Sequence, residues 1–442
     1  MPSIRARELW MVIALRLAAA AQIPDSPDAV VAGIPVNYRE AKAGTYALPE
    51  ALKLNSGKPV KDAKTWTKVR RPEVIRLIEE NWFGHAPGRP KEMSFEVTDA
   101  GTPAYGGKAL RRQVTIRFTK DGRGPSMDLL LHLPANAQGR VPVLLNMSFF
   151  ANNLAVTDSG VKVGRRWDRN TKTQVPAEPP PPPAAGAPAR PRFPGFPVEQ
   201  FLAAGIGVAT FNKDDLAPDF PGSEAMGVKG LYLKAGQAKP GDGEWGAIAA
   251  WAWGASRALD YLQTDRGVDA KRVAIHGVSR LGKTALWAGA SDERLAMVIA
   301  SCSGEGGAAI ARRNYGETLA HMAEPTRFPY QFAANYAKFS GKVNEWPVDA
   351  NLLLAAIAPR PLLLQTGSTD KWSDPYGEFL AAVAAGPVYE LLGKQALGTT
   401  KFPAAGEPIL HDLGYSMHDG GHGTVPADFG IYIRFMRQHF MK

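Results

Sequence analysis

The stretch KRVAIHGVSRLGKTALWAGA, residues 271–290, holds a serine where a short apolar strand pattern meets a helix pattern. The strand RVAIH runs into Gly277, and Ser279 is followed by Leu281 and Gly282 at the start of the helix. A nucleophilic serine in an α/β sheet lies on such a tight strand-to-helix turn, flanked by small residues. The spacing departs from G-x-S-x-G, because Leu281 occupies the second glycine position. The stretch predicts that Ser279 is a nucleophile; the alternative is a serine that only caps a helix.

Strand and helix patterns alternate on both sides of this turn. Strands are expected at 110–118, 128–133, 141–146, 205–211, 273–276, 295–300 and 361–365, and helices at 72–84, 244–262, 281–289 and from 427 to the C-terminus. This alternation is typical of a parallel sheet covered by helices on both faces. Together with the turn at Ser279, it predicts an α/β-hydrolase fold, a three-layer sandwich with a mostly parallel central sheet.

The length of 442 residues, 45% of them hydrophobic, allows one large domain. We expect a single α/β-hydrolase domain over 22–442, with an N-terminal approach segment at 22–100. Residues 152–196 break the strand pattern with a proline-rich stretch. Since proline fixes φ and removes a backbone donor, we interpret 152–196 as an exposed, partly ordered insertion. It is either a disordered surface loop or a cover over a cleft.

The first 21 residues have the pattern of a secretory signal peptide. Arg5 and Arg7 precede an apolar stretch that runs from Leu9 to Ala20 and ends in small residues. Arg16 interrupts the stretch, so a frayed N-terminal helix is the alternative. The stretch is too short to span a bilayer, and no later segment is long and apolar enough. We therefore expect a secreted or periplasmic protein.

The chain has 52 Lys and Arg against 42 Asp and Glu, a formal net charge of +10. These basic residues are scattered, so nucleic acid is not an expected partner, while attraction to an acidic polysaccharide remains open. The single cysteine, Cys302, excludes an intrachain disulfide and a site built from several cysteines. No close His/Glu metal spacing occurs either. We expect no metal, no cofactor and a monomer.

A serine nucleophile needs a histidine base, and in this fold the base follows the serine and the acid along the chain. The candidates are His411, His418, His422 and His439. His439 lies near the end of the last helix. His422 lies in a glycine-rich loop before that helix, which suits a base held over a sheet edge. His422 is the predicted base, and His418 is the alternative, unless it has a supporting or structural role.

The acid that orients the base is expected just past a late strand. Asp370 follows the strand PLLLQ in the sequence TGSTDKWSDP, and Asp374 is its rival. Asp374 directly precedes a proline, so capping of the next helix is a serious alternative for it. We predict that an Asp370 oxygen lies within hydrogen-bonding distance, about 2.6–3.2 Å, of a His422 ring nitrogen.

Acyl transfer also needs donors for the developing oxyanion. The Arg280 amide is placed by the turn itself, and a second donor is expected around 147–149. The Arg280 side chain could add a charged donor, or it could form an ion pair that stabilises its loop.

The block GVSRLGKTALWAG resembles the G-C-S-R-x-G-K motif of carbohydrate esterase family 15, the glucuronoyl esterases. The stretches RRPEVIRLIEENWFGHAPGRP, VDANLLLAAIAPRPLLLQTGSTDKWSDPYGEFLAA and the terminal GGHG are similar to that family as well. The resemblance covers most of the chain beyond about residue 40, apart from the proline-rich insertion. It implies an esterase that cleaves the ester between 4-O-methyl-glucuronic acid of glucuronoxylan and lignin alcohols.

The resemblance also implies roles for individual residues. Ser279 would be the nucleophile, His422 the base, and Arg280 a group that stabilises the oxyanion. Lys283 and Glu317 would bind the uronate hydroxyls, and Trp372 would line the pocket beside the sugar.

One position departs from the family pattern. Many members place the triad glutamate in an E-S-G-x-G-G stretch, and here this stretch begins with Cys302. Other members use an aspartate after the later strand, which matches Asp370. Glu305 is three positions displaced, and we expect it at the pocket edge. Val278 stands where the motif usually has cysteine, so the disulfide that some relatives form there is impossible.

Two other functions remain open at this level. One is a different acyl hydrolase, such as an acetyl-xylan esterase or a general carboxylesterase, although Lys283 argues against it because a simple acetyl ester needs no uronate-binding cation. The other is a carbohydrate-binding protein on a catalytically dead hydrolase scaffold, which an incomplete triad would favour.

Overall fold

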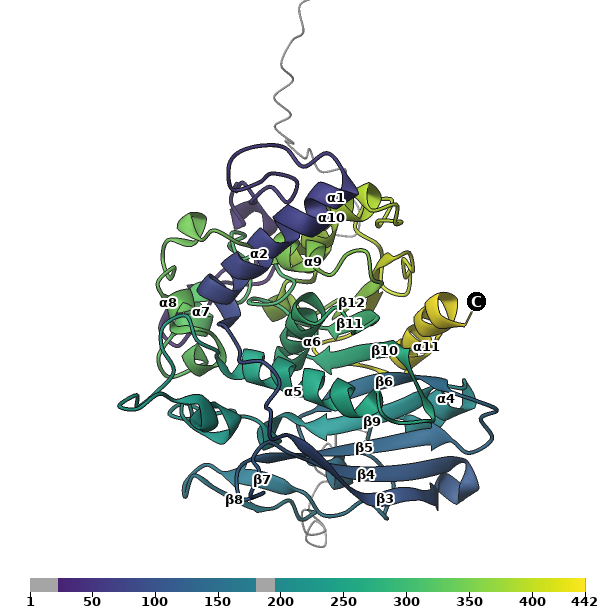
Figure 1. The fold of residues 1–442 in the computed structure, drawn as a ribbon. Coiled ribbons are helices and arrows are strands. Elements are labelled where there is room, and N and C mark those ends of the chain that lie inside the picture. Colours follow the sequence, from purple (N-terminus) through teal and green to yellow (C-terminus); the bar gives the residue numbers. More distant parts are fainter. Residues whose placement is uncertain (1–22, 180–194, 442) are drawn as a thin grey trace, which may run out of the picture.

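A nine-stranded sheet forms the centre of the structure, a computed structural model that describes residues 23–179 and 195–441 (Figure 1). The strand order is β13-β12-β11-β10-β6-β9-β5-β4-β3. The parallel strands are β6 (Val141–Ser148), β9 (Gly207–Asn212), β10 (Val268–Val278), β11 (Met297–Ser301), β12 (Leu362–Gly367) and β13 (Leu413–His418). The antiparallel strands are β3 (Ser94–Ala104), β4 (Ala109–Arg117) and β5 (Ser126–Pro134). The carboxyl ends of the parallel strands therefore share one edge, where a ligand crevice is expected.

Two short hairpins lie outside this sheet. They are formed by β1 (Ala29–Val31) with β2 (Ile34–Val36), and by β7 (Arg165–Asp168) with β8 (Thr173–Pro176).

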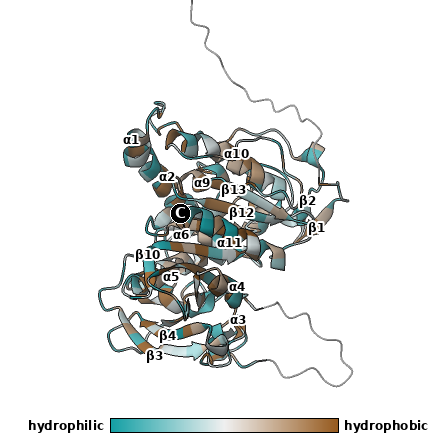
Figure 2. Ribbon diagram, turned by 90° about the vertical axis from the view of Figure 1, so that its right-hand side faces the viewer, coloured by the Kyte–Doolittle hydropathy of each residue, from teal (hydrophilic) through white to brown (hydrophobic). Residues whose placement is uncertain are grey.

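Helices cover both faces of the sheet. They are α1 (Ala63–Thr65), α2 (Arg71–Ile78), α3 (Asn152–Ala155), α4 (Val198–Ala203), α5 (Ala247–Leu262), α6 (Arg280–Ser291), α7 (Leu319–Ala323), α8 (Ala334–Ala337), α9 (Ala350–Ala355), α10 (Pro375–Leu391) and α11 (Pro426–Phe440). Several helix ribbons carry both hydrophobic and hydrophilic residues, as amphipathic helices do (Figure 2).

Each face of the sheet has its own hydrophobic core, built from alternate strand residues. In β6, Val143 and Leu145 belong to the core that includes residues of α2, α5, α6, α9 and α10. Leu144 belongs to the core that includes residues of α4 and α11. Successive side chains of a strand point to opposite faces, so a strand buried on both faces is apolar throughout. This explains the continuous apolar strand patterns of the sequence and confirms the three-layer α/β-hydrolase fold.

Every strand predicted from the sequence lies in the central sheet, but two strands of that sheet and the four strands of the two hairpins were not predicted. The edge strands β3 and β13 contain polar residues and glycine, which hide the strand pattern. The approach segment predicted at 22–100 is therefore wrong at its end, because β3 begins at Ser94 and joins the sheet. The helix predicted at 72–84 is α2 with π-helical turns at Trp66–Arg70 and Glu79–Phe83.

The segment 152–196 is partly regular. It contains α3 and the hairpin β7–β8, while residues 180–194, which include most of the proline-rich stretch, lie outside the described residues. The signal peptide predicted at 1–21 also lies outside them. Among the residues that the structure describes, no helix is both long enough and apolar enough to cross a membrane.

Candidate active site

Ser279 lies on the turn between β10 and α6, with φ 60° and ψ −127°. Few residues other than glycine adopt a positive φ, so the serine is held in a strained conformation. A Cβ on Gly277 would lie 2.1 Å from the Leu281 carbonyl oxygen, so this position must be glycine. A Cβ on Gly282 would lie 2.7 Å from the Ser301 carbonyl oxygen. The Ser279 side chain makes no capping hydrogen bond to α6, so the turn has the geometry of a nucleophile elbow and not of an ordinary helix cap.

His422 and Asp370 come from two neighbouring loops at the same edge of the sheet. His422 lies between β13 and α11, and Asp370 follows β12. Asp370 Oδ2 lies 2.6 Å from His422 Nδ1, within the range expected from the sequence. Burial opposes ionisation of Asp370, but hydrogen bonds from His422 and Ser373 outweigh it and hold the pKa of Asp370 below its ordinary value. With Nδ1 engaged, Nε2 of His422 is the nitrogen left to accept a serine proton.

The other candidate histidines have partners elsewhere. His418 Nδ1 lies 2.9 Å from Asp428 Oδ2, and its Nε2 lies 3.0 Å from the Gly421 carbonyl oxygen. His418 therefore holds the loop that carries His422. His411 bonds the Ala396 carbonyl oxygen at 2.8 Å. His439 lies 3.8 Å from Asp412.

The rival carboxylates are also engaged away from His422. Asp374 caps α10 by accepting from the Gly377 amide at 3.0 Å, and Arg313 Nε donates to it at 2.8 Å. Glu305 was expected at the pocket edge, and this is wrong. Its side chain is buried and accepts a hydrogen bond from the Tyr336 hydroxyl at 2.9 Å. Burial raises the pKa of Glu305 well above its ordinary value.

Cys302 lies beside the Asp370–His422 pair. Its Sγ, a carboxylate oxygen of Asp370 and a ring nitrogen of His422 lie within 4.8 Å of one another. The thiol donates to the Gly423 carbonyl oxygen at 3.3 Å, and the Gly423 amide approaches Sγ at 3.4 Å. Cys302 thus supports the loop that carries His422. It occupies the position at which the resemblance places the triad glutamate of many family members.

One cavity of about 290 Å³ brings together seven residues predicted for the site, namely Ser279, Arg280, Lys283, Glu317, Asp370, Trp372 and His422. The lining residues are Ser279, Arg280, Lys283, Cys302, Glu317, Met322, Arg327, Phe328, Gln331, Asp370, Trp372, Ser373 and His422. Met322, Arg327, Phe328 and Gln331 were not predicted from the sequence. They lie in and after α7, where no local motif distinguishes them, and only the fold brings them to the cavity.

Lys283 is a buried cation at this cavity. Among the described residues its ammonium has neither a hydrogen-bond partner nor an ion-pair partner. Burial lowers the pKa of Lys283, and the nearby Glu317 carboxylate opposes this effect. A buried ammonium with no partner retains its donors for a ligand.

Glu317 and Trp372 meet through Arg327. Arg327 Nη2 donates to Glu317 Oε1 at 2.6 Å, and its guanidinium lies 5.2 Å from the Trp372 ring centre and 5.0 Å from that of Phe328. The Glu317 amide donates to the Trp372 carbonyl oxygen at 2.9 Å. The ion pair with Glu317 and the packing of the Arg327 guanidinium on both rings fix this wall of the cavity.

Arg280 lines the cavity and also forms an ion pair. Its Nη1 donates to Asp219 Oδ2 at 2.9 Å, and its guanidinium lies 4.8 Å from the Phe328 ring centre. The ion pair that the sequence allowed for Arg280 is therefore present, and its role as a charged oxyanion donor stays a prediction. Residues 147–149, expected to supply a second oxyanion donor, are not among the lining residues, and Met147 and Ser148 belong to β6.

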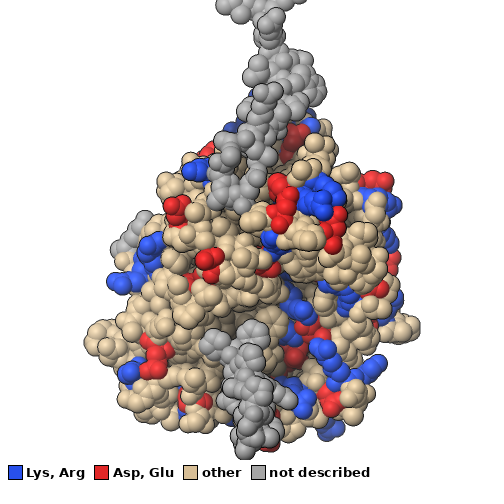
Figure 3. Space-filling view, turned by 180° about the vertical axis from the view of Figure 1, so that it is seen from behind, with Lys and Arg blue, Asp and Glu red and all other residues tan. Residues whose placement is uncertain are grey.

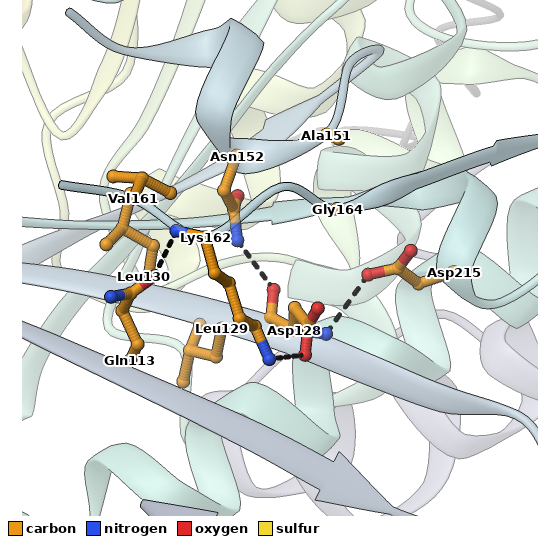
Figure 4. A pocket seen from close by; sticks show the side chains of 10 residues that line it. All are labelled: Gln113, Asp128, Leu129, Leu130, Ala151, Asn152, Val161, Lys162, Gly164 and Asp215. Carbon is orange, nitrogen blue, oxygen red and sulfur yellow. Dashed lines mark hydrogen bonds and ion pairs between the residues drawn. The ribbon is translucent and has the colours of Figure 1, made fainter. Parts of the chain in front are cut away.

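A second, much smaller cavity lies on the antiparallel part of the sheet (Figure 4). Lys162 from the insertion donates to Asp128 Oδ1 at 2.7 Å there, and the Asp128 amide donates to Asp215 at 3.0 Å. Its volume of about 10 Å³ holds at most one water. The bond between Lys162 and Asp128 anchors the insertion to β5. The cavity itself is too small for a substrate.

Charged side chains are mixed on the face of the molecule that Figure 3 shows. Lys and Arg lie next to Asp and Glu, and no broad basic surface forms among the described residues drawn there. The positive net charge is therefore not concentrated on that face.

A buried carboxyl group next to the site makes stability depend on pH. Glu378 Oε1 accepts from the Gly304 amide at 2.6 Å, while its buried Oε2 has no partner among the described residues. Burial raises the pKa of Glu378 to about 8, from an ordinary value of 4.5. The folded chain therefore holds a proton that the unfolded chain releases, so this group's contribution to stability falls as pH rises from 4.5 towards 8.

We expect Glu378→Gln to remove this pH dependence, because glutamine does not titrate. Denaturant unfolding at pH 5, 6, 7 and 8 should show the variant gaining stability relative to wild type by up to about 1.4 kcal/mol per pH unit. The exposed Glu92→Gln serves as the control and should run parallel to wild type. A constant difference between Glu378→Gln and wild type across this range would contradict the account.

Comparisons with known proteins agree with this geometry. The family model for the fungal glucuronyl esterases matches residues 164–393. Carbohydrate esterase MZ0003, from an unknown prokaryotic organism, is 39% identical over 431 residues, which are 97% of this chain and 98% of that protein. The solved structure of a glucuronoyl esterase from Solibacter usitatus has 43% sequence identity and a TM-score of 0.83, and the match covers 91% of this chain and 100% of that one. A 4-O-methyl-glucuronoyl methylesterase from Podospora anserina is 31% identical over 86% of this chain and 64% of its own length.

The sheet order and the turn at Ser279 define an α/β-hydrolase, and its relatives make it a carboxylic ester hydrolase. The chain belongs to the glucuronoyl esterases, carbohydrate esterase family 15.

Proposed function

We propose that this protein hydrolyses esters of glucuronic acid, including those that join 4-O-methyl-glucuronic acid of glucuronoxylan to lignin alcohols. The observation that carries the proposal is the 2.6 Å bond between Asp370 and His422 in a cavity that Ser279 and the unpaired Lys283 also line. The family and the names of its relatives, glucuronoyl esterase and 4-O-methyl-glucuronoyl methylesterase, support the same substrate class.

In this mechanism Ser279 Oγ attacks the ester carbonyl while His422 Nε2 takes its proton. Asp370 holds the imidazole in the required tautomer and stabilises the imidazolium. The Arg280 amide and guanidinium stabilise the oxyanion of the tetrahedral intermediate. His422 then protonates the departing alcohol, and a water molecule activated by the same histidine releases the uronic acid from Ser279.

Recognition of the acyl part falls to the buried polar wall of the cavity. Lys283 and Glu317 bind the uronate hydroxyls, Trp372 lies beside the sugar ring, and Arg327 holds Glu317 and Trp372 in place. The cavity offers a buried ammonium that an acetyl group would leave without a partner. This difference favours a sugar acid over a simple acetyl ester.

Lys283→Met should therefore change substrate preference. We expect kcat/KM for benzyl glucuronate to fall on the order of 10²-fold, because a hydrogen-bonding cation is lost, while kcat/KM for benzyl acetate changes by less than about 3-fold. Both esters release the same alcohol, so the comparison isolates recognition of the acyl group. Equal losses on both esters would show that Lys283 has a structural role only.

We also infer that residues 1–21 are a signal peptide, that residues 22–442 form a single domain and that the protein is exported as a monomer. The pattern of the first 21 residues supports export, as does a substrate that lies in plant cell walls. Mass spectrometry of the protein from the culture medium or periplasm tests export and removal of the signal peptide, and light scattering of the same sample tests the monomer. An unprocessed N-terminus in the cell interior would contradict export.

A further inference from the structure

We propose that Asp219 is a positioning residue that holds the Arg280 guanidinium at the oxyanion. The proposal rests on the role proposed above for Arg280. The Asp219 side chain is only 9% exposed, it lies in the loop after β9, and it does not line the cavity itself. It therefore acts on the reaction only through Arg280.

Four donors converge on the Asp219 carboxylate. Arg280 Nη1 and Lys213 Nζ lie 2.9 Å and 3.1 Å from Oδ2. The Tyr330 hydroxyl and Gln331 Nε2 donate to Oδ1 at 2.7 Å and 3.0 Å. A carboxylate has about four lone-pair sites, so this one is fully occupied and cannot rotate without breaking a bond. Arg280 is thereby bound to a fixed anchor.

A second contact holds Arg280 from another direction. Its guanidinium stacks on Phe328, whose ring also lies against the guanidinium of Arg327. The Arg327 guanidinium also lies over the Trp372 ring and donates a hydrogen bond to Glu317. Arg280 is thus one end of a rigid wall in which each arginine has a carboxylate partner. Donors that are fixed before the reaction stabilise the transition state without a cost of reorganisation.

Asp219 belongs to a cluster of charged side chains that includes Arg280. The pKa of Asp219 lies well below its ordinary value, because Lys213 and Arg280 together outweigh the effect of burial. Lys213 is buried and forms ion pairs with Asp219 at 3.1 Å and with Asp214 at 2.6 Å, so two carboxylates share its charge. The Arg280 guanidinium lines the cavity and is the cation of this cluster that faces the developing oxyanion.

Asp219→Asn tests the proposal in a double-mutant cycle with Arg280→Ala. In the wild-type background we expect kcat for benzyl glucuronate to fall about 10- to 10²-fold with KM changed less than about 3-fold, since only the transition state carries the oxyanion. In the Arg280→Ala background the same change should cost less than about 2-fold. Tyr330→Phe is the matched control, because it removes one donor to Oδ1 and leaves the Arg280 bond intact. It should cost less than about 3-fold.

Equal losses in both backgrounds would overturn the proposal and assign Asp219 a structural role. An Arg280→Ala enzyme with wild-type kcat would instead refute the role of Arg280 on which the proposal rests. If Asp219→Asn does not fold, Asp219→Glu keeps the charge but displaces it by one methylene. That variant should unfold near the wild-type temperature with a kcat at least about 5-fold lower, because the guanidinium moves, and a wild-type kcat would overturn the proposal.

Discussion

Ser279→Ala is expected to lower kcat for benzyl glucuronate on the order of 10³-fold or more. The serine lies on the strained turn after β10, at the cavity that His422 also lines. Removing its hydroxyl removes the atom that forms the acyl-enzyme, and no other hydroxyl group replaces it at this turn. The fold should survive, because the Ser279 side chain makes no capping hydrogen bond to α6.

The matched control is Ser291→Ala at the other end of α6. The Ser291 hydroxyl donates to the Trp287 carbonyl oxygen at 2.7 Å and does not line the cavity. Its removal should leave kcat within about 2-fold of wild type. Circular dichroism and thermal unfolding confirm that both variants are folded. A folded Ser279→Ala protein that keeps its activity would refute the mechanism.

Asp370→Asn should lower kcat on the order of 10³- to 10⁴-fold. If the asparagine accepts a hydrogen bond from Nδ1–H through its side-chain oxygen, it still lacks the negative charge that stabilises the imidazolium. If it donates through its amide, it fixes the wrong tautomer, and Nε2 then carries the proton that Ser279 must lose. In the first case the base is weakened and in the second it is lost, although the geometry is kept in both.

Glu305→Gln is the control for Asp370→Asn. Glu305 lies in the stretch 302–307, where the resemblance places the triad acid of many family members. Glu305 is buried and accepts a hydrogen bond from Tyr336, which a glutamine oxygen can also accept, so Glu305→Gln should cost less than about 5-fold in kcat. The steady-state rates of both variants on benzyl glucuronate check the assignment. A larger loss for Glu305→Gln than for Asp370→Asn would move the acid to position 305.

The parts of the site that depend on local sequence could be predicted. Ser279, Arg280 and Lys283 belong to one continuous strand-turn-helix stretch, so their proximity follows from helix geometry. His422 and Asp370 lie 52 residues apart, and their contact was still predictable because the fold orders its late loops at one sheet edge. Asp374 was correctly suspected of capping a helix, because a proline follows it.

The rest depends on contacts between distant segments. Nothing in the stretch 302–307 reveals that Glu305 is buried and bonded to Tyr336. Arg327 reaches the cavity, and Asp219 reaches the Arg280 guanidinium, from loops with no distinctive pattern. The edge strands β3 and β13 lack the continuous apolar pattern of the central strands, because one side of an edge strand has no neighbour. Only the folded chain reveals these contacts.

The central claim is that Ser279 is an activated nucleophile, and labelling by a fluorophosphonate with peptide mapping tests it most directly. We predict one label per chain, on Ser279, with no label in Ser279→Ala and much slower labelling in Asp370→Asn. A folded wild-type protein that takes up no label, or takes it up on another residue, would contradict the account and favour a catalytically inactive scaffold.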